Sequence, residues 1–127
     1  MRSTRVVLAA VFVAVVGCTD FRNPDAPDGT VCTTQFVYGL SVTVQDVKTG
    51  ERFCDADISA TSDAYQERLQ LGSLVGCVYL GAGERPGVYD LTANKPGYRP
   101  AVFNNIRVAA DACHVATTRV SLSLARE

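Results

Sequence analysis

Five cysteines and one histidine are the residues of this chain best suited to chemistry. Cys18 directly follows an apolar N-terminal run, whereas the other cysteines lie in the body of the chain. No two cysteines have the C-x-x-C spacing that is typical of a structural zinc site. Cys113 adjoins the single histidine, His114, but neighbouring residues of a strand point to opposite faces, which makes joint ligation of a metal awkward. We therefore expect no metal and no cofactor.

Cys18 ends a segment that has the features of an export signal. A positively charged start is followed by an unbroken apolar run at residues 6–16, closer in length to a signal-peptide core than to the roughly 20 residues of a membrane-spanning helix. Residues 15–18, Val-Val-Gly-Cys, resemble the lipobox of bacterial lipoproteins. The resemblance implies that residues 1–17 are a signal peptide and that Cys18 becomes the first mature residue, with a diacylglycerol on its sulfur.

A lipid on Cys18 would hold the protein at a membrane. One acyl chain binds a bilayer only marginally, but two or three chains on one residue, palmitate among them, make the attachment long-lived. In the bacterial sorting pattern an Asp after the cysteine favours the inner membrane, so Thr19 implies the outer membrane of the cell envelope. Two alternatives stay open, a plain secretory leader or an N-terminal buried strand, each with Cys18 incidental.

The rest of the chain has the size and charge of one mildly acidic domain. About 110 residues follow the leader, which is one domain of ordinary size. The whole chain has 12 Lys and Arg against 13 Asp and Glu, and two of the basic residues lie in the leader. No basic patch suggests nucleic acid, and no second apolar segment suggests another membrane crossing. Residues 18–31 are rich in Pro, Gly and Asp and are expected to be a flexible linker, since their aspartates lack the spacing of a calcium loop.

Short alternating segments separated by turn residues make up the domain. At residues 40–45, Leu40, Val42 and Val44 fall on the face opposite Ser41 and Thr43, which predicts a half-buried strand. A weaker third segment is ambiguous between a strand and a helical turn, and we count it as a strand. About seven strands with no convincing helix predict a seven-stranded antiparallel β-sandwich. The expected strands are residues 40–45, 56–61, 65–71, 77–80, 88–93, 102–108 and 115–124, with a loop at 81–87.

Two stretches resemble carboxypeptidase regulatory-like domains, which are transthyretin-like (prealbumin-like) sandwiches. Residues 44–60 are similar to the first hairpin of that family, with a Thr-Gly turn and then Cys-Asp-Ala-Asp-Ile-Ser-Ala. Residues 87–98, Gly-Val-Tyr-Asp-Leu-Thr-Ala-Asn-Lys-Pro-Gly-Tyr, are similar to its most recognisable stretch. There Gly97 suits a turn that needs positive φ, and Tyr98 can fold back over the corner. The resemblance implies this fold for residues 32–127 and says little about activity.

The four cysteines that follow Cys18 are an even number in an exported chain, which predicts two disulfides. If successive strands alternate in direction, the starts of the first and last strands lie at one end of the sandwich, and the starts of the second and fourth at the other. This favours Cys32 with Cys113 and Cys54 with Cys77. The two other pairings stay open, because a miscounted third strand reverses the argument. Oxidised cysteines would carry no thiolate chemistry.

The sequence offers few residues for catalysis. Transthyretin-like folds include hydroxyisourate hydrolases, which use more than one histidine, an arginine and a C-terminal Tyr-Arg-Gly-Ser, whereas this chain has only His114 and ends Leu-Ala-Arg-Glu. His114 could act as a lone general base, but beside a cysteine that begins a strand we expect a surface or packing residue. Glu84 and Arg85, in the Gly-rich loop, form either a recognition tip on a rigid scaffold or charges that solvate a turn.

We therefore expect a lipid-anchored cell-envelope protein that acts as a non-catalytic binding or structural module. Its partners would be the membrane, through Cys18, and another envelope protein, but no nucleic acid. The alternative is carbohydrate or peptidoglycan binding, in which Tyr65, Tyr79 and Tyr89 would stack on sugars if exposed, although core packing suits Tyr89 better. An enzyme would instead need a cleft that gathers His114 with carboxylates from other strands.

Overall fold

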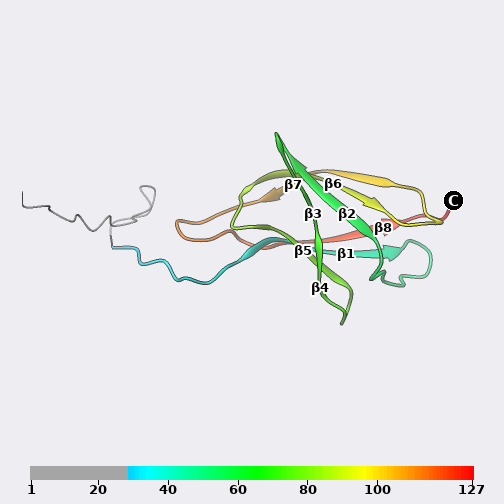
Figure 1. Ribbon diagram of the computed structural model, residues 1–127, viewed down its shortest axis with the longest axis horizontal. Coiled ribbons are helices and arrows are strands. Elements are labelled where there is room, and N and C mark those ends of the chain that lie inside the picture. Colours follow the sequence, from blue (N-terminus) through cyan, green and yellow to red (C-terminus); the bar gives the residue numbers. More distant parts are fainter. Residues whose placement is uncertain (1–28) are drawn as a thin grey trace, which may run out of the picture.

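The computed structural model describes residues 29–127, which form eight strands and no helix. The predicted signal peptide, Cys18 and most of the predicted linker lie outside these residues. The described chain enters at one end of an elongated body, and its C-terminus lies at the opposite end (Figure 1). The strands are β1 (Tyr38–Asp46), β2 (Asp57–Ser62), β3 (Tyr65–Arg68), β4 (Gln70–Ser73), β5 (Val78–Gly83), β6 (Gly87–Asn94), β7 (Ala101–Val108) and β8 (Thr118–Leu124).

The strands form two four-stranded sheets, so the prediction of an all-β, two-sheet protein is confirmed. The first sheet has the order β4-β5-β1-β8 and the second the order β3-β2-β6-β7. Strands β1 and β8 are parallel neighbours, with Val44 opposite Leu122, and all other neighbours are antiparallel. The expected purely antiparallel pairing is therefore wrong for β1 and β8, because two strands that run in the same direction lie side by side.

A single core lies between the two sheets. The alternation seen in the sequence places apolar side chains on the inner faces, and the buried residues of both sheets belong to one cluster. Each fully buried Leu or Val stabilises the fold by roughly 1.5–3 kcal/mol relative to an exposed one. The first sheet contributes Leu40, Val42, Val44, Tyr79, Leu122 and Leu124, and the second contributes Ile58, Ala60, Tyr89, Leu91 and Ala93.

The segment at residues 65–71 accounts for the eighth strand. It divides at the buried residue Leu69, where the chain leaves the edge of the second sheet as β3 and joins the edge of the first as β4. The backbone N–H of Leu69 still donates to the carbonyl of Ile58 at 2.8 Å, so the crossing residue stays bonded to the second sheet. The expectation of a single strand here is wrong, since one extended run serves two sheets.

A polar corner closes the end of the sandwich near the C-terminus. Asp46 is 1% exposed, and its carboxylate accepts hydrogen bonds from the backbone N–H groups of Lys48 and Thr49, from the Tyr98 hydroxyl and from Arg126. These donors hold the pKa of Asp46 far below its ordinary range. Gly97 has φ 82°, and Tyr98 is buried over the corner, as predicted for both residues.

Candidate functional site

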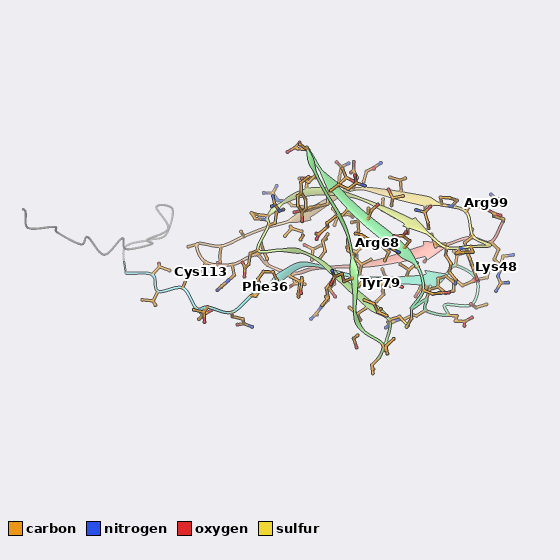
Figure 2. All side chains as sticks on the ribbon, viewed as in Figure 1. Phe36, Lys48, Arg68, Tyr79, Arg99 and Cys113 are labelled. Carbon is orange, nitrogen blue, oxygen red and sulfur yellow. A yellow bond between two sulfur atoms is a disulfide. The ribbon has the colours of Figure 1, made fainter. Side chains whose placement is uncertain are left out.

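Two disulfides join distant parts of the chain, and they are the same pairs that strand direction favoured. Cys54 is bonded to Cys77 and Cys32 to Cys113. Cys113 and Phe36 lie at the end where the chain enters, whereas Lys48 and Arg99 lie at the opposite end (Figure 2). The parity argument holds because the split segment at 65–71 keeps one direction through both sheets.

The Cys32–Cys113 disulfide brings the next residue of each segment together. The Thr33 hydroxyl oxygen lies 3.0 Å from Nε2 of His114, and Nδ1 of His114 lies 2.8 Å from Oε1 of Glu84. We call these five residues, Cys32, Cys113, Thr33, His114 and Glu84, the N-terminal clasp. His114 is therefore bonded on both ring nitrogens, to groups from two other parts of the chain.

Glu84 is the centre of the clasp rather than an exposed tip. Its Oε1 also accepts the backbone N–H of Val37 at 2.8 Å, and its Oε2 accepts that of Val115 at 3.4 Å. Partial burial opposes the charge of Glu84, but the hydrogen bonds from His114 and from these two amides outweigh it and keep the pKa below its ordinary value. The carboxylate thus joins the start of β1 to the segment before β8.

The loop that carries His114 is held by a second carboxylate. Asp111 accepts the backbone N–H groups of Cys113 and His114, both at 2.8 Å, and donates its own N–H to the carbonyl of His114. These amide hydrogen bonds lower the pKa of Asp111. The imidazole is therefore presented from a closed turn, which fixes its position against Thr33 and Glu84.

Tyr65, Tyr79 and Tyr89 do not form the exposed face that carbohydrate binding would require of them. The Arg85 guanidinium lies 3.9 Å from the centre of the Tyr65 ring, which covers that ring. Tyr79 and Tyr89 are buried, and the Tyr89 hydroxyl donates to the carbonyl of Arg85 at 2.9 Å. The idea of a stacking surface made from these three tyrosines is wrong, because two of them belong to the core.

A different aromatic pair is exposed, at the start of β1. Phe36 is 60% exposed and Tyr38 is 42% exposed. Their rings meet edge to face, with centres 5.1 Å apart and planes at 83°. The pair precedes the alternating run that identified the strand, so the sequence pattern did not predict it. Phe36-Val37-Tyr38 itself alternates, however, with a half-buried Val37 between the two exposed rings.

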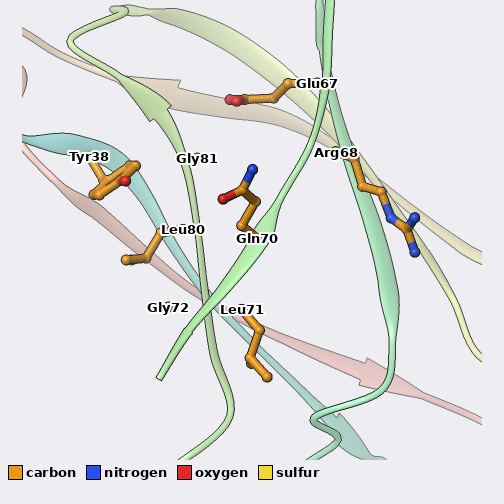
Figure 3. A pocket seen from close by; sticks show the side chains of 8 residues that line it. All are labelled: Tyr38, Glu67, Arg68, Gln70, Leu71, Gly72, Leu80 and Gly81. Carbon is orange, nitrogen blue, oxygen red and sulfur yellow. The ribbon is translucent and has the colours of Figure 1, made fainter. Parts of the chain in front are cut away.

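Tyr38 forms one wall of a shallow pocket where β3 passes into β4. We call it the Tyr38 pocket, and its volume is about 190 Å³. Glu67 and Gln70 extend toward β5 at Gly81, on the side where Tyr38 lies, whereas Arg68 extends away (Figure 3). The pocket is lined by Tyr38, Glu67, Arg68, Gln70, Leu71, Gly72, Leu80 and Gly81.

Small residues at the end of β5 make room for this site. Residues 81–83 were expected to be loop, but they continue β5, with Gly81 opposite Leu40 and Gly83 opposite Tyr38. A side chain at Gly83 would collide with the Phe36 ring, and one at Gly81 would press on Glu67. The backbone N–H of Ala82 also donates to Oε1 of Glu67. The Gly-Ala-Gly sequence therefore provides the surface on which the aromatic pair and Glu67 rest.

A second pocket lies where β6 starts and β7 ends, with a volume of about 420 Å³. Small and apolar residues dominate its walls, with Arg107 as the one charged side chain among them. Its lining residues are Pro86, Gly87, Val88, Arg107, Val108, Ala109 and Ala110. None of the clasp residues lines either of these two pockets.

Between residues 29 and 127, no three His, Cys, Asp or Glu side chains are grouped so that they could hold a metal ion. The same residues include no helix that is long and apolar enough to cross a bilayer. A scan against protein-family models and a search of curated proteins both found no match to this chain.

Proposed function

We propose that this chain is a lipid-anchored protein of the bacterial cell envelope, placed in the outer membrane. In this proposal residues 1–17 are a cleaved signal peptide, and Cys18 carries the lipid. Residues 32–127 are a carboxypeptidase regulatory-like, transthyretin-like sandwich that serves as a binding or structural module. The cysteine count carries the proposal: the chain has five cysteines, four are paired in the body, and the remaining one ends the lipobox.

Two features support a binding role for the sandwich. Disulfides form in oxidising compartments, and here they join segments that are 81 and 23 residues apart in the chain, which makes a rigid scaffold. Exposed aromatic side chains at the entry end, Phe36 and Tyr38, offer a contact surface on that scaffold. The carboxylates of Glu84 and Asp46, by contrast, are engaged in holding backbone segments together.

The intact mass of the protein extracted from its native membrane tests the anchor. We expect a chain that starts at Cys18, is heavier by its acyl groups, and takes up four alkyl labels only after reduction. A Cys18→Ser variant, which keeps the leader but lacks the sulfur, should accumulate as uncleaved, unacylated precursor. An unacylated wild-type chain, or free thiols before reduction, would overturn the proposal.

A second candidate function is acyl hydrolysis, and the clasp is the observation that favours it. The order hydroxyl, imidazole, carboxylate at 3.0 and 2.8 Å is the arrangement that activates a serine or threonine nucleophile. In such a reaction the Thr33 oxygen bonds to an ester carbonyl carbon while His114 takes the hydroxyl proton. The imidazole then passes that proton to the leaving alcohol, and water releases the acid from Thr33.

Hydrolysis of p-nitrophenyl acetate by the full chain tests this second candidate. Thr33→Ala should abolish the activity and Thr33→Ser should keep it, because serine retains the hydroxyl. Thr34→Ala is the matched control, since Thr34 is its exposed neighbour with no hydrogen bond to the clasp within residues 29–127. Equal rates for wild type and Thr33→Ala would exclude the candidate and leave the clasp as a structural device.

A further inference from the structure

We propose that the Tyr38 pocket binds a single uncharged sugar ring of a cell-envelope glycan. This inference rests on the proposed envelope location of the domain, and it names a ligand class for the binding module. It places the contact on Tyr38, and not on the tyrosines that the sequence suggested.

The Tyr38 ring is accessible and is held in a fixed orientation. It packs edge to face against Phe36, which in turn lies on the bare backbone of Gly83. A ring that is already fixed loses little conformational freedom when a ligand stacks on it, and this lowers the cost of binding. The apolar face of a sugar ring, made of C–H groups, is well suited to such an aromatic surface.

Polar groups that could bond sugar hydroxyls surround the ring. Within residues 29–127, neither the Tyr38 hydroxyl nor the Gln70 side-chain amide has a hydrogen-bond partner. Glu67 uses Oε1 to accept the Ala82 N–H, and the second carboxylate oxygen stays available as an acceptor. The pocket thus offers a hydroxyl, an amide and a carboxylate oxygen beside one aromatic face, and Figure 3 shows Glu67 and Gln70 directed to that side.

The charge of the pocket selects against anionic sugars. Its one cation, Arg68, points away and forms an ion pair with Asp57, with Nε 2.8 Å from Oδ1. The Glu67 carboxylate therefore has no counter-charge inside the pocket. A uronate or a phosphorylated sugar would place a second negative charge beside Glu67, which costs free energy in a partly desolvated site.

The size of the pocket limits the ligand to one ring. A volume of about 190 Å³ lies below the range of roughly 300–1,000 Å³ that is usual for sites of drug-sized ligands. Affinity for a single sugar would accordingly be weak. Many copies of a membrane-held domain on a polymeric glycan would gain apparent affinity from their high local concentration.

Saturation-transfer NMR on the full-length, detergent-solubilised protein tests the inference, with glucose and N-acetylglucosamine as uncharged probes. Glucuronate is the charged counterpart of glucose and should bind at least about fivefold more weakly. Tyr38→Ala should weaken binding of the uncharged sugars at least about fivefold, because an aromatic contact of this kind is lost. Tyr38→Phe keeps the ring but lacks the hydroxyl, so it should weaken binding less than Tyr38→Ala does.

Gln70→Ala should also weaken binding, and Gln66→Ala is its matched control. Gln66 is an exposed glutamine of β3 that faces Thr61 on the neighbouring strand and does not line the pocket. No binding of either uncharged sugar, unchanged binding by Tyr38→Ala, or tighter binding of glucuronate would each overturn the inference. If the protein is acylated but binds no sugar, this inference is wrong and the proposed lipid anchor stands. If the protein is not acylated but binds glucose at Tyr38, the proposed lipid anchor is wrong and this inference stands.

Discussion

Replacing both Cys54 and Cys77 by alanine measures what a disulfide contributes when its surroundings are already ordered. The two residues are 23 apart in sequence, and closing a loop of that length stabilises the fold by about 3.4 kcal/mol in the chain-entropy relation. Buried neighbours, Phe53 and Tyr79, hold both segments in place without the bond. The native state therefore gains little freedom when the bond is removed, and we expect nearly the full loss.

The same change at Cys32 and Cys113 should behave differently. Their separation of 81 residues gives about 4.5 kcal/mol by the same relation. Residues 29–36 belong to no strand, however, so without the bond this segment can leave the surface. The freedom that it regains in the native state offsets part of the loss. The measured cost should therefore fall clearly below the calculated value.

Urea unfolding of the wild type and of the two double variants, followed by circular dichroism, measures both losses of stability. We expect an unfolding free energy lower by about 3 kcal/mol for the Cys54 and Cys77 variant, with a somewhat steeper dependence on urea concentration, because the unfolded chain without the cross-link is less compact and exposes more surface. If the Cys32 and Cys113 variant loses its full calculated value, the segment before β1 is an integral part of the fold. That result, or a loss under 1 kcal/mol at Cys54 and Cys77, would refute the reasoning.

Three further predictions follow from individual contacts. Tyr79→Phe should lower the unfolding free energy by about 2 kcal/mol in urea titrations, because the buried Tyr79 hydroxyl donates to the carbonyl of Phe53 and accepts the N–H of Ala56. Tyr89→Phe removes only one hydrogen bond, so its unfolding free energy should fall by less. Gly97→Ala should lower the unfolding free energy by about 1–2 kcal/mol in the same measurement, because φ is 82° at Gly97 and no neighbouring atom obstructs a Cβ there. Gly97→Asn should lower it by less, because asparagine adopts a positive φ more readily than alanine. Glu84→Gln should flatten the acid limb of a stability-against-pH curve. The folded pKa of Glu84 is depressed, so its contribution is present above the ordinary value of 4.5 and is lost as the pH falls below it; an equally steep acid limb in the variant would contradict this.

Local patterns in the sequence were sufficient to predict two packed sheets, but not to predict where the strands at the sheet edges begin and end. Alternation at residues 40–45 identifies β1 and its buried face because a half-buried strand must alternate. The break at Leu69 leaves no such trace, since an extended chain that changes sheets keeps the same alternation. Residues 81–83 looked like a loop because glycine disfavours strands, and their pairing depends on a distant partner in β1.

The two candidate sites, the N-terminal clasp and the Tyr38 pocket, could likewise be predicted only in part from the sequence. Strand direction alone favoured the Cys32–Cys113 bond, and once that bond is given, Thr33 and His114 must be neighbours. That Glu84 completes the clasp depends on the positive φ of 48° at Glu84, which no sequence pattern encodes for a glutamate. The Tyr38 pocket likewise needs Phe36 on Gly83, a contact between residues 47 apart that only the folded register of β1 and β5 brings about.

The parallel pair of β1 and β8 also determines how the domain bears mechanical load. Tension on the chain ahead of Cys32 divides at the disulfide, so that part enters β1 directly and part crosses to Cys113 and the segment that leads into β8. The two strands start at the same end and lie side by side, so both are pulled along their length. Because both strands are pulled in the same direction, the force does not slide one past the other, and the hydrogen bonds between them are not sheared. A pull from this end is therefore resisted by two strands of the first sheet together rather than by one.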